Sequence, residues 1–306
     1  MHEWINQAKE EHLNQKDILT FDQYLMQVEE SPEKLLRTSS TYILDMLSYF
    51  GKNEDGGFKL FTQNHPNSTA VFGQIHAQKE LEKNLRNFSD EGINNKFILL
   101  VGPNGSAKSS FIKKIMIGLE EYSKIEEGTN YSFSWIFPID QYTKGSLGFS
   151  RGTTQSDDSL DSYAGLDDGE ISAILGSELK DHPILLIPQE YRREVLNKLL
   201  DDKPKVLENI KKTFLYNGDI SKRNKMVYEA LLKSYKGDHQ EVLKHIRVER
   251  YDISKRYSTG AVTIEPQIHV DAQMQQITMD KRLGSLPPSL QSLNLFQMNG
   301  QLVMAN

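Results

Sequence analysis

Cysteine is absent from the 306 residues of this chain. That absence excludes disulfide scaffolds, cysteine nucleophiles and thiolate sites for zinc or iron–sulfur clusters. Long apolar runs are also missing, because no stretch approaches the roughly 20 residues that a membrane-spanning helix needs. The first residues show neither the basic start nor the apolar centre of a secretion signal. We therefore expect a cytoplasmic protein with no membrane partner.

Positive charge is in short supply as well. The 36 Lys and Arg residues are outnumbered by 42 Asp and Glu residues, which gives a net charge of −6. General nucleic-acid binders carry the opposite balance, so a nucleic-acid partner is disfavoured. Hydrophobic residues make up 38% of the chain, an ordinary share that can form a sizeable core. The length allows one large domain, or a core with a smaller lobe.

The opening of the chain has helix signals. Thr20 and Gln23 have the spacing of a capping box, and an apolar face starts with Phe21. A second apolar face covers residues 43–50, where Gly51 is a plausible helix stop. We predict a helical lead and linker over residues 1–70.

Residues 71–306 are predicted to form the main domain. Five consecutive apolar residues at 97–101 are typical of a strand buried on both faces of a parallel sheet. Residues 132–139 and 184–187 are further strand candidates, and residues 190–250 are mostly helical by pattern. The predicted fold class is therefore α/β, with a parallel sheet of the P-loop NTPase type, flanking helices and a small helical lobe in front.

A low-complexity stretch interrupts this predicted domain. Seventeen of the 26 residues at 144–169 are Gly, Ser, Asp or Thr. Few of these side chains can join a packed core, so the stretch is predicted to be a flexible loop.

One motif carries chemistry, and it directly follows the predicted strand at 97–101. Gly102 and Gly105 allow a tight turn that brings backbone N–H groups close to phosphate oxygens. Lys108 supplies an ammonium group for the phosphates, and Ser109 a hydroxyl of the kind that binds Mg²⁺. An amphipathic helix is predicted to start near Lys108, and its N-terminus favours anions. The predicted nucleotide-binding residues are Gly102, Pro103, Asn104, Gly105, Ser106, Ala107, Lys108, Ser109 and Ser110.

The motif departs from the usual pattern at Ala107, where glycine is expected. A methyl group there would crowd the phosphates, unless the local backbone is helical, where alanine is preferred. A working ATPase also needs acidic residues at the end of a second buried strand. The only internal candidate is Asp140, which follows Pro138 and has no acidic neighbour. The catalytic residues are thus unknown, and the expected cofactors are ATP and Mg²⁺.

Beyond this motif, the chain resembles the bacterial PrkA-type serine protein kinases, which carry an AAA+ ATPase domain in their N-terminal half. The resemblance spans about residues 19–306, and in that family the last segment runs on into an acidic Walker B strand. The chain therefore resembles an N-terminal piece that stops before this strand. The similar segments are Leu19–Leu25, Ser31-Pro32, Ile43–Met46, Val71–Gly73, Ser177–Pro188, Gly218–Ser221, His245–Arg250, Thr259–Gln267 and Asn299–Asn306.

The resemblance implies an ATP-binding AAA+ domain that uses Mg·ATP to phosphorylate an unidentified protein, with a homo-oligomer expected for the full-length protein. The piece alone is expected to be inactive. Three alternatives stay open: an AAA+ ATPase that drives remodelling or proteolysis, a nucleotide-sensing module without turnover, and an ABC-transporter ATPase subunit. The last shares the loop except for Ala107, but the chain lacks its Leu-Ser-Gly-Gly-Gln segment.

Overall fold

The computed structural model describes residues 18–65, 68–92, 97–139, 162–262 and 264. Four strands form one sheet in the order β1-β4-β2-β3, and every neighbouring pair is antiparallel. The strands are β1 (Ile18–Leu19), β2 (Tyr131–Pro138), β3 (Ile171–Gly176) and β4 (Ile246–Arg250).

Strand β2 is the centre of the sheet, and all eight of its residues are buried. Its aromatic side chains at 133, 135 and 137 alternate with Ser132 and Ser134, the period of two that a strand requires. The indole N–H of Trp135 donates to Asn224 Oδ1 at 3.0 Å. The amide of Asn224 in turn donates to Ser177 Oγ and Asp181 Oδ2 at 2.9 and 2.8 Å. This buried network joins the sheet to helix α12 (Lys222–Ser234).

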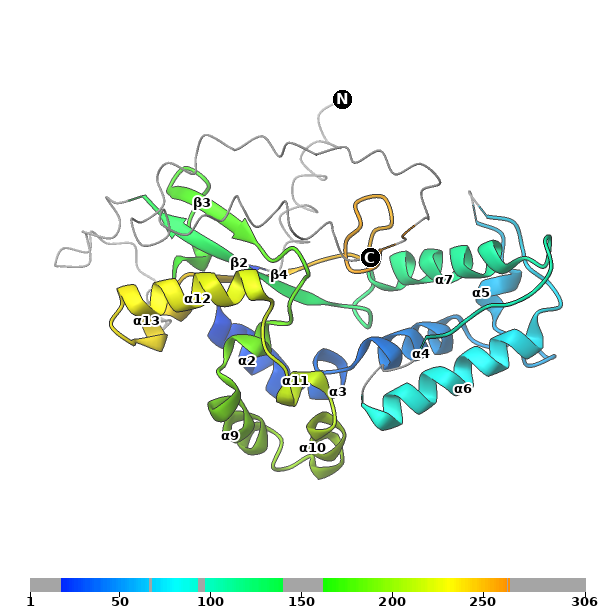
Figure 1. Cartoon of the computed structure of the whole chain (residues 1–306), viewed down its shortest axis with the longest axis horizontal. Helices are drawn as coiled ribbons and strands as arrows, with labels where there is room; N and C mark the ends of the chain where they lie inside the picture. Colours follow the sequence, from blue (N-terminus) through cyan, green and yellow to red (C-terminus); the bar gives the residue numbers. More distant parts are fainter. Residues whose placement is uncertain (1–17, 66–67, 93–96, 140–161, 263, 265–306) are drawn as a thin grey trace.

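Helices from both ends of the described chain cover the sheet core, and Figure 1 shows most of them below the sheet. The capping box of Thr20 and Gln23 is confirmed, with both reciprocal hydrogen bonds present at the start of α2. The helices of this half are α2 (Phe21–Glu30), α3 (Pro32–Leu35), α9 (Gln189–Leu199), α10 (Pro204–Lys211), α11 (Phe214–Asn217), α12 (Lys222–Ser234) and α13 (His239–Leu243), with the 3₁₀ turns η1 (Tyr163–Gly165) and η2 (Pro183–Leu186).

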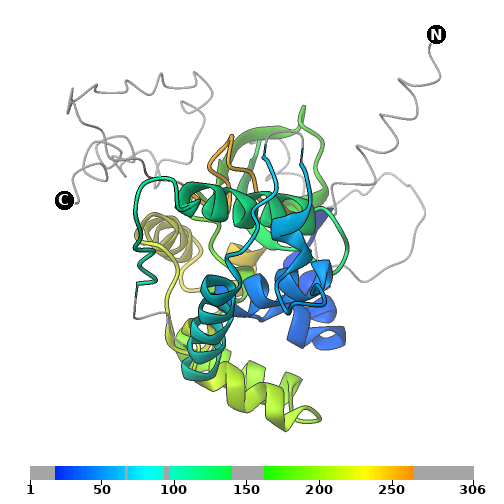
Figure 2. The same cartoon turned by 90° about the vertical axis from the view of Figure 1, so that its right-hand side faces the viewer.

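A second apolar core lies beyond the end of the sheet, between four helices. They are α4 (Ser39–Phe50), α5 (Lys59–Thr62), α6 (Ile75–Glu91) and α7 (Lys108–Tyr122). Figure 2 shows α4 and α5 (blue) beneath α7, which contacts both. The close approach depends on Gly118, because a Cβ there would lie 2.8 Å from the side chains of Met46 and Leu60. Helix α4 ends at Phe50, and Gly51 has φ +75°, so the predicted stop is confirmed.

The predicted parallel sheet is wrong, since the four strands pair antiparallel. Residues 97–101 form no strand: Phe97 is fully exposed, and Leu99 and Val101 are 81% and 83% exposed. An apolar run needs hydrogen-bonding neighbours to become a strand, and the central position of the sheet is taken by β2 instead. The predicted strand at 184–187 is also wrong, because residues 183–186 form the 3₁₀ turn η2 between two prolines.

Two further predictions about the secondary structure are confirmed. Residues 132–139 do lie in a strand up to Pro138, and residues 190–250 are mostly helical, as predicted. Residues 144–161 of the predicted flexible loop lie outside the described residues, whereas 163–165 form η1. The division at residue 70 stays a prediction. In the described ranges, none of the helices combines the length and the apolar character that a membrane crossing requires.

Candidate functional site: the glycine loop and the two ends of helix α7

The glycine loop, defined here as residues 102–107, leads directly into α7, which begins at Lys108 as predicted. The Lys108 side chain folds back over the loop. Its ammonium group donates to the carbonyl oxygens of Gly102 and Pro103, both at 2.7 Å, and to Ser106 Oγ at 3.1 Å. The Lys108 ammonium group therefore links three residues of the glycine loop. The predicted phosphate-binding residues lie together in this turn.

The backbone of the glycine loop is left-handed at two positions, Gly105 with φ +81° and Ala107 with φ +60°. Such turns direct successive peptide N–H groups to one side, which makes a backbone concavity suited to anions. The conformation is strained for Ala107, since a Cβ disfavours the left-handed region. The right-handed helical backbone that would have suited alanine is not present there, and this is a correction to the sequence analysis.

Glycine at 102 has a steric reason. A Cβ at Gly102 would lie 2.8 Å from Ser106 Oγ, the hydroxyl that accepts from Lys108. The loop is also held from outside, because the side-chain amide of Gln74 donates to the carbonyl oxygen of Ser106 at 3.3 Å. Gln74 precedes α6, so the glycine loop lies beside the start of that helix.

The N-terminus of α7 has no side-chain cap, because Ala107 occupies the N-cap position and has no acceptor. The first amides of a helix lack intrahelical acceptors, and together with the helix dipole they favour an anion. No acidic residue stands in the first turn of α7. The donors at this end therefore face solvent beside the Lys108 ammonium.

A magnesium ion would have one protein ligand at this end, the hydroxyl group of Ser109. Ser109 is exposed, and within the described residues its hydroxyl has no hydrogen-bond partner. No group of three or more His, Asp or Glu side chains in the described ranges could hold a metal. This donor set fits an ion that arrives on nucleotide phosphates, since Mg²⁺ commonly combines few protein ligands with substrate phosphates. Asp140, the acidic candidate, lies outside the described residues.

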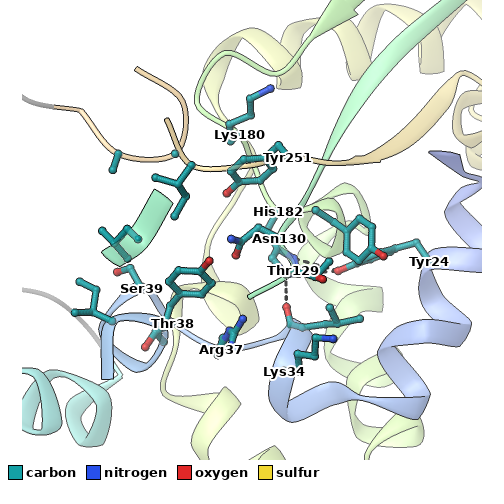
Figure 3. A pocket seen from close by; sticks show the side chains of 18 residues that line it. Tyr24, Lys34, Arg37, Thr38, Ser39, Thr129, Asn130, Lys180, His182 and Tyr251 are labelled. Carbon is teal, nitrogen blue, oxygen red and sulfur yellow. Dashed lines mark hydrogen bonds between the residues drawn. The ribbon is translucent and has the colours of Figure 1, made fainter. Parts of the chain in front are cut away.

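The other end of α7 borders a cavity of about 270 Å³ that the sequence analysis missed. Figure 3 shows it between Arg37 and Thr38 on one side and Tyr251 on the other. Leu119 also lines it, about 16 Å along the helix axis from Lys108 at 1.5 Å per residue. The lining comes from stretches between Tyr24 and Ala261 that lie far apart in the sequence, so no local motif could have revealed it.

A half-buried histidine closes one wall of this cavity. His182 Nε2 lies 2.7 Å from the carbonyl oxygen of Leu35, and its Nδ1 accepts from the amide of Ile184 at 3.3 Å. This pairing assigns the proton to Nε2. Burial lowers the pKa of His182 to about 4, so the ring is neutral at pH 7. It ties η2 to the end of α3.

No family model, curated protein or solved structure matches this chain.

Proposed function

We propose that the chain binds Mg·ATP at residues 102–110, and that it belongs to a protein that uses ATP to phosphorylate another protein. The second part depends on the resemblance to PrkA-type kinases alone. The first part is supported by the position of Lys108, whose ammonium group stands at the mouth of a left-handed loop and at the uncapped start of α7. The ammonium group, the helix dipole and the backbone N–H donors would thus all favour an anion at the same place.

The contacts of Lys108 also indicate how a phosphate would enter. All three of its observed hydrogen bonds go to neutral oxygens of the glycine loop. A phosphate oxygen carries a negative charge, so it adds a Coulombic attraction to the ammonium group that a neutral carbonyl or hydroxyl oxygen does not offer. The lysine would therefore exchange a loop acceptor for a phosphate oxygen, while the amides of residues 108–110 donate to the remaining phosphate oxygens. The Ser109 hydroxyl would meet the magnesium ion.

A second candidate function is nucleotide sensing without turnover. It is favoured by the lack of a metal-holding acidic group among the described residues. Groups that stabilise the phosphates equally before and during reaction supply binding, whereas acceleration needs groups that act mainly on the transition state. Lys108 and the loop amides belong to the first kind. We therefore expect this chain to bind Mg·ATP and to hydrolyse it slowly.

The test is calorimetric titration of the chain with Mg·ATP, accompanied by a phosphate-release assay. Lys108→Ala should weaken binding about ten- to a hundredfold, the loss expected for one charge-assisted contact. Lys113→Ala is the matched control: it removes the same charge from an exposed position on the same helix and should leave the affinity within about twofold. Unchanged affinity in Lys108→Ala would contradict the phosphate site. Rapid phosphate release would reject the sensing alternative.

A further inference from the structure

The cavity at the C-terminal end of α7 carries an excess of positive charge. Three cationic side chains line it: Lys34, Arg37 and Lys180. Its lining, all of it within the described residues, contains no Asp or Glu. Arg37 pairs with Asp45 at 3.0 Å, but Asp45 does not line the cavity. The two lysines have no carboxylate within ion-pair distance among the described residues, and His182 is neutral at pH 7. The positive charge of the lining residues therefore favours an anionic ligand.

A helix N-terminus adds to this charge. Helix α4 begins at Ser39, its N-cap is Thr38, and both residues line the cavity. Thr38 Oγ1 caps the helix by accepting from the amide of Thr41 at 3.3 Å. The first turn holds no acidic residue, so no negative charge in that turn offsets the partial positive charge of this end. The opposing negative end belongs to α7, and there Arg250 donates to the carbonyl oxygens of residues 123, 124 and 125 at 3.2, 2.8 and 3.0 Å.

Arg37 supplies a second, independent observation. Its side chain is only 6% exposed. The terminal nitrogens donate to Asp45, to the Tyr122 hydroxyl at 3.2 Å and to the carbonyl oxygen of Glu127 at 2.8 Å. The buried Nε has no acceptor among the described residues. Both terminal nitrogens thus donate to protein acceptors, and the Nε atom has no accessible surface, so Arg37 contributes its charge to the cavity and not a free donor.

Further donors face Arg37 across the cavity. Figure 3 shows the Tyr251 hydroxyl and the Asn130 amide directed into the hollow from the side opposite Arg37. The Tyr251 hydroxyl has no hydrogen-bond partner within the described residues. Apolar side chains complete the lining, among them Ile43, Leu119 and Ile253. The cavity therefore combines polar donors on opposite sides with apolar wall, which is the usual composition of a small-molecule site.

The volume limits the size of the ligand. At about 30 Å³ per water molecule, 270 Å³ corresponds to about nine waters. That is just below the range of about 300 to 1,000 Å³ typical of drug-sized ligands. We propose that this cavity binds a small organic anion with one ring, whose carboxylate or phosphate group meets Arg37, Lys34 and the start of α4 while the ring lies on the apolar wall.

Phenyl phosphate is the probe, with benzyl alcohol as a neutral ligand of similar size, each titrated into the whole chain by calorimetry. Phenyl phosphate should bind saturably and at least about tenfold more tightly than benzyl alcohol, as expected where one charge-assisted contact decides. Lys34→Gln should weaken phenyl phosphate about threefold or more, whereas Lys205→Gln, at an exposed position outside the cavity, should not. Ala261→Phe should abolish binding, since it fills the cavity.

A folding control and the Lys108→Ala variant complete the experiment. Circular dichroism and the Tm of each variant establish that it is folded. Lys108→Ala should leave unchanged the phenyl phosphate binding that Lys34→Gln weakens, because the glycine loop lies at the other end of α7. Equal binding of benzyl alcohol, or phenyl phosphate binding that survives both Lys34→Gln and Ala261→Phe, would overturn the proposal, and so would its loss in Lys108→Ala.

Discussion

The two ends of helix α7 differ in how their backbone groups are satisfied. At the C-terminal end, the protein supplies the partners: Arg250 donates to three successive carbonyls, and Ser123 Oγ accepts from the amide of Ile253 at 2.9 Å. At the N-terminal end, Ala107 provides no cap, and the first amides stand beside Lys108 without a side-chain acceptor. Side-chain caps are also absent at the starts of α6, α9, α10 and α12, so the missing cap alone does not mark a site. The glycine loop and the Lys108 ammonium group distinguish the start of α7, and there we expect a ligand.

The two ends of α7 also differ in backbone strain. Ala107 adopts a left-handed backbone at the open end, whereas the residues after Tyr122 continue in ordinary turns that Arg250 holds. Unfavourable backbone conformations persist at functional sites when neighbouring structure imposes them. Here Gln74 and the Lys108 ammonium group impose it. Three predictions test this contrast, beginning with the largest expected effect.

The first prediction concerns the satisfied end. Arg250→Met keeps most of the aliphatic stem but removes a cation that three carbonyl oxygens share. We expect the free energy of unfolding to fall by about 3 kcal/mol, since the carbonyls lose a charged donor and the helix dipole loses its counter-charge. Urea denaturation measures the loss. Arg256→Met, at an exposed position, should change stability by less than about 0.5 kcal/mol; equal effects in both variants would contradict the account.

The second prediction is that the free energy of unfolding depends on pH through His182, which lines the cavity at the C-terminal end of α7. Burial holds the pKa of His182 at about 4, below its ordinary value of 6.5. Between pH 4 and 6.5 this histidine is protonated in the unfolded chain and neutral in the folded chain. Its contribution to the free energy of unfolding is therefore complete above about pH 6.5 and is lost as the pH falls toward 4. At pH 5 the expected loss is about 2 kcal/mol, at 1.36 kcal/mol per pH unit.

His182→Gln provides the control, because a glutamine amide can still donate to the carbonyl oxygen of Leu35. Burial also lowers the pKa of His245, which acts in the same direction and persists in the variant. The acid-induced loss of stability between pH 7 and 5 should therefore shrink in His182→Gln without vanishing. Identical pH profiles for the two proteins would show that His182 is not held neutral. Urea unfolding at a series of pH values makes the comparison.

The third prediction is the smallest in energy and concerns the open end. Ala107→Gly should stabilise the chain by about 1 kcal/mol, since glycine has no Cβ to disfavour the left-handed backbone. It should leave Mg·ATP affinity equal or tighter. Ala230→Gly, in the middle of α12, should destabilise by about 1 kcal/mol, because glycine is a poor helix former. Thermal unfolding of both variants measures the signs, and a loss of stability in Ala107→Gly would contradict the left-handed assignment.

Local signals in the sequence located much of the secondary structure. The capping box at Thr20, the stop at Gly51 and the start of α7 each depend on neighbouring residues, and each prediction is confirmed. The sheet could not be predicted in this way. An apolar run at 97–101 looks the same whether it is a buried strand or an exposed segment, because pairing partners lie far away in the sequence.

The two sites differ in the same respect. The glycine loop is one continuous segment with fixed spacing, so its residues could be named from sequence, although the left-handed backbone at Ala107 could not. The cavity joins Arg37, Asn130, Lys180 and Tyr251, which only folding brings together. Its charge balance follows from tertiary structure, and no composition or periodicity of the chain indicates it.

Hydrogen–deuterium exchange of the chain, with and without Mg·ATP, tests the central claim most directly. If the open end of α7 is the phosphate site, the amides of residues 105–110 should become protected when the nucleotide binds, and Lys108→Ala should abolish that protection. The amides at the closed end, residues 123–128, should exchange at the same rate in both conditions. Protection confined to the closed end, or no protection at residues 105–110 at saturating Mg·ATP, would contradict the account.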